Sequence, residues 1–90
     1  MREDFFMQYM IMCRSLTYAQ RAASALERSG ITAAISRAPQ ELTGGGCGYC
    51  VKVSGRRFNS ALKALDAKEI PYGRLFRIEE DGGYTEVSGT

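Results

Sequence analysis

Two strand-helix-strand patterns follow one another within 90 residues, and this order constrains the fold more than any other feature of the chain. Residues 6–13 are apolar apart from Gln8, on both faces, which is typical of a central strand. Residues 18–29 carry alanines and a leucine at helical spacing, and Gly30 stands where a left-handed residue ends a helix. Residues 31–36 alternate as a half-buried strand. The first half therefore predicts strand, helix, strand.

The second half repeats this order after Pro39 and a glycine-rich loop. Residues 49–54 alternate, with Tyr49, Val51 and Val53 predicted on one face and Cys50 and Lys52 on the other. Apolar side chains at i, i+3, i+4 and i+7 predict an amphipathic helix over residues 58–69. Residues 74–79 alternate again, and Asp81-Gly82-Gly83 favours a hairpin turn before a short edge strand at residues 84–87.

A βαββαβ order in so short a chain favours an α+β, ferredoxin-like sandwich. We expect a four-stranded antiparallel sheet with two helices on one face and an extra C-terminal edge strand as an option. The whole chain, residues 1–90, would form a single domain, with a core over about residues 6–79 and a hairpin or tail over residues 80–90. The other sheet face would be open, and its apolar surface could be buried in a homodimer.

Composition excludes several classes of function. Histidine is absent, which removes the usual general base and every imidazole metal ligand, so we expect no independent enzymatic turnover. A net charge of +2 gives no reason to expect a nucleic-acid partner. The apolar run at residues 5–13 is too short to span a membrane. An odd set of three cysteines fits a reducing, cytoplasmic compartment better than a secreted disulfide scaffold.

The chemistry is concentrated in the segment Gly44-Gly45-Gly46-Cys47-Gly48-Tyr49-Cys50. Its C-x-x-C spacing suits a redox pair, but a thioredoxin-type cysteine opens a helix, whereas a strand is predicted here. A structural zinc ion needs four ligands and the chain offers three thiols. We therefore expect no metal and no separate cofactor, and keep zinc or an iron-sulfur cluster as a minor alternative that a shared dimer site or a carboxylate ligand could complete.

The remaining interpretation is a nucleophilic thiol on a glycine-rich loop. Backbone N–H groups of Gly45, Gly46 and Gly48 could form a nest for a thiolate, persulfide or selenide anion. Nearby basic side chains would favour the thiolate form, and the sequence offers Arg37, Lys52, Arg56 and Arg57. Cys13 ends the first strand and is interpreted as a small core residue.

Pro39-Gln40-Glu41-Leu42-Thr43, followed by Cys47-Gly48, resembles the selenium/sulfur (Se/S) carrier protein-like domains. The resemblance covers about residues 6–78. It implies that Cys47 holds the chalcogen, that Gly48 is its glycine neighbour, and that Pro39, Glu41 and Leu42 form the stem of the loop. The chain departs from the family pattern in an extra glycine before Cys47, in Gln40 where a basic residue is frequent, and in the second thiol of Cys50.

From this resemblance we expect a carrier that takes sulfur or selenium from a cysteine desulfurase-like donor and passes it to an acceptor protein. Cys47 and Cys50 would form the thiol relay, with Cys50 releasing the cargo through a disulfide. The alternative is a non-catalytic interaction module, or a ligand- or metal-sensing one, of the same fold. Other patterns give weaker evidence of function. The triple glycine lacks the lysine and the following helix of a phosphate-binding loop. Tyr49 is a single candidate for base stacking, whereas RNA-binding modules use several aromatic residues, and the acidic run at residues 79–81 fits a solvated turn.

Overall fold

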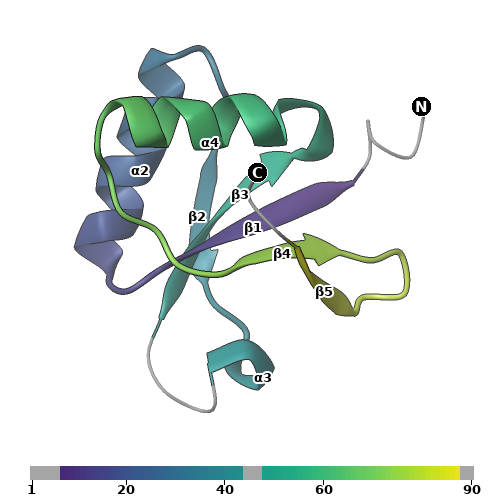
Figure 1. The fold of residues 1–90 in the computed structure, drawn as a ribbon. Coiled ribbons are helices and arrows are strands. Elements are labelled where there is room, and N and C mark those ends of the chain that lie inside the picture. The colour runs from purple at the N-terminus through teal and green to yellow at the C-terminus, as the bar shows by residue number, and fades with distance from the viewer. Residues whose placement is uncertain (1–6, 44–47, 88–90) are drawn as a thin grey trace.

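A computed structural model describes residues 7–43 and 48–87, and these residues form one layer of sheet with helices against it (Figure 1). Along the chain the elements are β1 (Gln8–Cys13), α2 (Leu16–Arg28), β2 (Ala34–Arg37), α3 (Gln40–Thr43), β3 (Tyr49–Ser54), the 3-10 turn η1 (Gly55–Arg57), α4 (Phe58–Ala67), β4 (Leu75–Ile78) and β5 (Tyr84–Val87). The predicted βαββαβ order is therefore confirmed.

The sheet has five antiparallel strands in the order β2-β3-β1-β4-β5. Its first four strands have the neighbour order expected of a ferredoxin-like sandwich. The prediction of a four-stranded sheet with two helices lacked two elements. Strand β5 extends the sheet, and α3 adds a third helix. The optional C-terminal edge strand at residues 84–87 is thus present, paired with β4.

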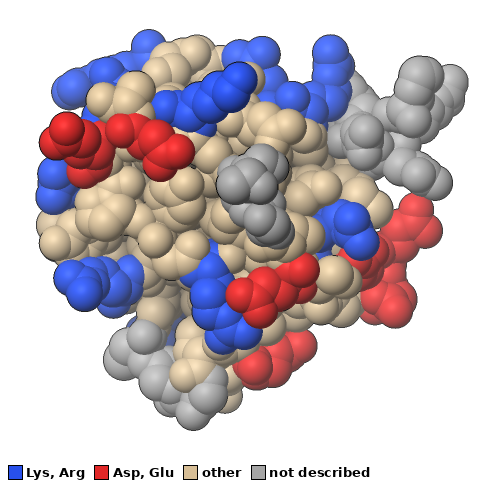
Figure 2. Space-filling model, viewed as in Figure 1, with Lys and Arg blue, Asp and Glu red and all other residues tan. Residues whose placement is uncertain are grey.

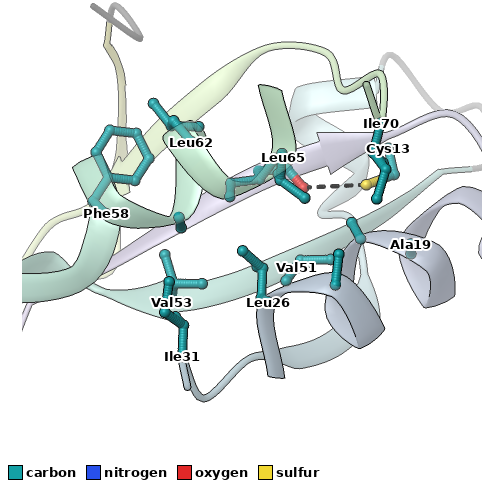
Figure 3. Close-up of a cluster of buried hydrophobic side chains, with 14 of the residues drawn as sticks. Cys13, Ala19, Leu26, Ile31, Val51, Val53, Phe58, Leu62, Leu65 and Ile70 are labelled. Atoms are coloured by element: carbon teal, nitrogen blue, oxygen red, sulfur yellow. Dashed lines mark hydrogen bonds between the residues drawn. The ribbon is translucent and has the colours of Figure 1, made fainter. Parts of the chain in front are cut away.

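Helices α2 and α4 cover one face of the sheet, and the main core lies between them and the strands (Figure 1). Ile11 of β1 and Val51 of β3 are register partners, and both are fully buried in this core. Leu26 of α2 and Leu65 of α4 point into it from the helical side (Figure 3). Alternation within each strand therefore placed these side chains on the face that the helices cover.

The two long helices, α2 and α4, have defined ends. Helix α2 begins after Ser15, whose Oγ accepts a hydrogen bond from the Tyr18 N–H at 3.3 Å. At its C-terminal end the Ile31 N–H donates to the Leu26 carbonyl across Gly30, whose φ is +81°. The end of α4 repeats this Schellman pattern with Ile70, Leu65 and Glu69, although Glu69 is not glycine and has a φ of 56°.

The face of the sheet opposite the helices is partly covered, which corrects the expectation of an open face. Met10, Cys50 and Phe76 are buried there and form a second apolar cluster. Leu42 of α3 and Tyr84 of β5 pack against it. The apolar surface that suggested a homodimer is therefore largely buried within the chain itself.

The second strand is shorter than the predicted residues 31–36, because Ile31 belongs to the end of α2 and β2 begins at Ala34. Ile35 was expected on the buried face but is 38% exposed. It lies on the edge strand β2, which has a neighbour on one side only, so its side chain receives less cover. Among the described residues, no helix has the length and apolar character needed to cross a bilayer.

Candidate functional site

The predicted cysteine loop connects β2 with β3, and its base is closed by a hydrogen bond. The Ala38 N–H donates to the Gly48 carbonyl at 3.0 Å, directly beyond the register pair of Arg37 and Tyr49. The described residues do not include Gly44, Gly45, Gly46 and Cys47. The anion nest and the chalcogen-bearing sulfur of Cys47 therefore stay predictions from the sequence. The structure describes the frame that holds the two ends of this segment.

Gly48 lies in the tightest part of this frame. A Cβ atom at this position would be 3.2 Å from the Thr43 Cγ2 and 3.6 Å from the Ala38 Cβ. A residue with a Cβ would press on the Thr43 side chain, which would have to shift by a few tenths of an ångström. The close approach of Thr43 and Ala38 therefore favours glycine here, which gives a physical reason for the Cys-Gly pair recognised in the sequence.

The stem residues form the one-turn helix α3. The Leu42 N–H donates to the Pro39 carbonyl at 3.0 Å, and the Leu42 side chain packs against the cluster of Met10, Cys50 and Phe76. Glu41 is exposed on the same turn. Leu42 is thus the apolar anchor of the stem, whereas Glu41 makes no buried contact.

Cys50 is fully buried in the cluster that Leu42 packs against. Its exposed fraction is 0%, and its Sγ lies 3.4 Å from the Oγ of Ser36 on the neighbouring strand β2. Ser36 is partly buried and was not singled out in the sequence. The strand alternation that placed Cys50 opposite Val51 was correct, but alternation does not reveal what covers a face. A relay step at Cys50 requires this cover to open.

Cys13 is buried on the helical side of the sheet, as predicted for a core residue. Its thiol donates a weak hydrogen bond to the Ile11 carbonyl at 3.7 Å (Figure 3). Burial, and secondarily the nearby Cys50 thiol, raises the pKa of Cys13 from 9.0 to about 11. The protonated thiol therefore dominates at neutral pH, and Cys13 is a poor nucleophile.

The basic residues expected to favour a thiolate are divided between two ends of the sheet. The Arg37 guanidinium carbon lies 6.0 Å from the centre of the Tyr49 ring, at the loop end of β3. Arg56 and Arg57 follow the other end of that strand, roughly 17 Å away at the usual rise per residue. Arg57 there donates to the Gly30 carbonyl at 3.2 Å. Of these three arginines, Arg37 is thus the one next to the loop frame.

The wider surface carries both signs of charge. In Figure 2 basic side chains lie over α2 and α4 with acidic ones among them, and further acidic side chains lie near the turn between β4 and β5. Arg74 and Glu86 form an ion pair at 3.0 Å between the last two strands. Within residues 7–43 and 48–87, no three His, Cys, Asp or Glu side chains converge as metal ligands would.

The fold is that of a small ferredoxin-like domain in which α3 and the start of β3 hold the two ends of the cysteine-bearing segment. A family model described as "Putative Se/S carrier protein-like" matches residues 8–77, more than three quarters of the chain. The chain belongs to this family, as the Pro39–Thr43 and Cys47-Gly48 patterns suggested. Searches of curated proteins and of solved structures found no match.

Proposed function

We propose that this protein carries sulfur or selenium as a covalent adduct of Cys47 and hands it from a cysteine desulfurase-like donor to an acceptor protein in the cytoplasm. Membership of the carrier-like family supports the class of function. The observation that carries the assignment to this loop is its frame: Gly48, next to Cys47, is fixed between Ala38 and Thr43, and Leu42 anchors the stem.

In the loading step the Cys47 thiolate attacks the outer sulfur of a donor persulfide. A new sulfur–sulfur bond forms at Cys47, the donor's own sulfur–sulfur bond breaks, and the donor cysteine leaves as a thiolate. The persulfide proton stays on the transferred sulfur, so neither an oxidant nor a reductant is consumed. Arg37, at the loop end of β3, supplies positive charge that favours the thiolate form of a nearby cysteine.

The second relay thiol would act at release. The Cys50 thiolate attacks the inner sulfur of the Cys47 persulfide, a Cys47–Cys50 disulfide forms, and hydrosulfide leaves with its proton. Because Cys50 is fully buried beside Ser36, in the cluster that Leu42 packs against, this step first needs the cover of that cluster to open. The β-carbons of the two cysteines must also approach to about 4 Å. We therefore assign loading to Cys47 and a slower, gated release to Cys50.

The test is incubation of the reduced protein with a cysteine desulfurase and cysteine, followed by intact mass spectrometry. We expect one added sulfur atom on the wild type, on Cys50→Ala and on Cys13→Ala, and none on Cys47→Ala. Cys13→Ala is the matched control, since it removes a buried thiol that has no assigned role. Equal loading of all variants, or loading of none, would reject the carrier role of Cys47.

A further inference from the structure

A cavity of about 400 Å³ opens where β1 passes into α2, on the side of the connection between α4 and β4. Its walls are residues 12–14, Tyr18 and residues 71–73. The connection is tied to β1 by two hydrogen bonds, from the Gly73 N–H to the Met12 carbonyl at 2.8 Å and from the Met12 N–H to the Arg74 carbonyl at 2.9 Å. The two walls are therefore held together by backbone and do not depend on a ligand for their position.

The volume suits a small molecule rather than an ion or a peptide. Pockets for small organic ligands span roughly 300–1,000 Å³, so this cavity is at the lower end of that range. Tyr18 of α2 and Tyr72 of the connection between α4 and β4 contribute aromatic rings to the lining, and Met12 and Pro71 add apolar surface. These side chains suit a flat, apolar ligand body.

Among the described residues that line the cavity, Arg14 carries the one charged side chain. Its guanidinium carbon lies 5.5 Å from the centre of the Tyr18 ring, and the Arg21 guanidinium approaches the same ring at 5.7 Å. The described part of the chain shows no ion pair to Arg14. Asp66, the acid recorded against a lining residue, accepts a hydrogen bond from the Tyr72 hydroxyl at 3.2 Å.

We propose that this cavity binds a small organic carboxylate with a flat apolar body, whose carboxylate pairs with Arg14 and whose body lies between Tyr18 and Tyr72. A guanidinium held over an aromatic face presents its N–H groups in one plane, which is the geometry that a carboxylate accepts. The cavity is a second site, and it does not depend on the carrier function of Cys47.

The position of this site gives it a route to the loop. Cys13, in its lining, is the register partner of Tyr49, and Tyr49 follows Gly48 at the loop frame. A ligand bound here would contact Cys13, whose partner across the strand pair is the first residue of β3. Its occupancy is therefore expected to change the environment of Tyr49 and Gly48 as well as that of the cavity walls.

The experiment is titration of the ¹⁵N-labelled protein with phenylacetate, and separately with its uncharged analogue phenylacetamide, followed by amide chemical shifts. We expect saturable shifts at Arg14, Tyr18, Tyr72 and Gly73 with phenylacetate. Binding of phenylacetamide should be weaker by about threefold to tenfold, the range for one partly exposed charge-assisted contact. Shifts that do not saturate, or that map to another surface, would overturn the proposal.

Two variants separate recognition by charge from general apolar binding. Arg14→Gln should weaken phenylacetate to the level of phenylacetamide and leave phenylacetamide unchanged. Arg28→Gln removes another exposed arginine, at the far end of α2, and should leave both affinities unchanged. If both arginine variants weaken phenylacetate equally, the effect is the net charge of the protein and the assigned contact is wrong.

Discussion

At the scale of single residues, the two described thiols are buried in different ways, and neither is exposed to a partner. Cys13 belongs to the helical core, whereas Cys50 belongs to the cluster of Met10 and Phe76 on the opposite face. The sheet therefore separates the two sulfur atoms, although Met12 and Cys50 are register partners. This arrangement leaves Cys47 as the thiol to which the carrier function is assigned.

Cys13 makes stability depend on pH in a defined direction. Burial raises the pKa of its thiol from 9.0 to about 11, so the folded protein retains a proton that the unfolded chain loses more readily. This contribution to the free energy of unfolding is complete below about pH 9 and is lost as the pH rises toward about 11. Urea unfolding at about pH 8 and about pH 10.5 should show a larger loss for the wild type than for Cys13→Ala. Equal losses would contradict the burial of this thiol.

At the scale of elements, the ends of α2 and α4 form a matched pair. Both close with the same hydrogen-bond pattern and bury the isoleucine that follows, but the left-handed position holds Gly30 in one and Glu69 in the other. A residue with a Cβ is disfavoured there by about 1 kcal/mol.

We therefore predict that Gly30→Ala lowers the free energy of unfolding by about 1 kcal/mol and that Glu69→Gly raises it by a similar amount. No atom lies within 4 Å of a Cβ built at Gly30, so the effect there belongs to the backbone alone. Denaturant unfolding measures both. Gly73→Ala is the control, because its Cβ would meet only ordinary contacts, the nearest being the Met12 carbonyl oxygen at 3.5 Å. A change of the same sign in both helix variants would refute the explanation.

Helix α3 is a separate element whose position depends on one side chain. Leu42 packs against the cluster that contains Cys50, so Leu42→Ala should loosen the cover of that thiol. In a Cys47→Ala background we expect alkylation of Cys50 by iodoacetamide to be at least about tenfold faster in Leu42→Ala, in proportion to the larger open population. Glu41→Ala, an exposed change on the same turn, should leave the rate unaltered. A rate that is insensitive to Leu42 would show that α3 does not control access to Cys50.

At the scale of the whole molecule, the sequence was sufficient for the order of elements but not for what covers each face. Alternation placed Val51 and Val53 toward the helices and Cys50 away from them, because side chains in a strand change face at every residue. The one-turn helix α3 was missed, since four residues are too few for a helical repeat to be visible. Ile35 lies on the predicted face, as the register partner of the buried Val51, but its burial was overestimated because periodicity cannot tell an edge strand from a central one.

The candidate site was predictable to a similar extent. Pro39, Leu42 and Gly48 were recognised by family pattern, and the structure supplies their physical roles as the start of α3, its anchor and a close chain approach. Ser36 could not be found in this way, because its relation to Cys50 arises only from the pairing of β2 with β3.

We assign Cys47 as the reactive thiol of a fold that buries its other two cysteines. Brief treatment of the native wild-type protein with iodoacetamide at neutral pH, with the label located by peptide mass spectrometry, tests this assignment. We expect label on Cys47, and on Cys13 and Cys50 only after unfolding in urea. Native labelling of Cys13 or Cys50 as fast as that of Cys47, or a Cys47 that resists labelling, would contradict it.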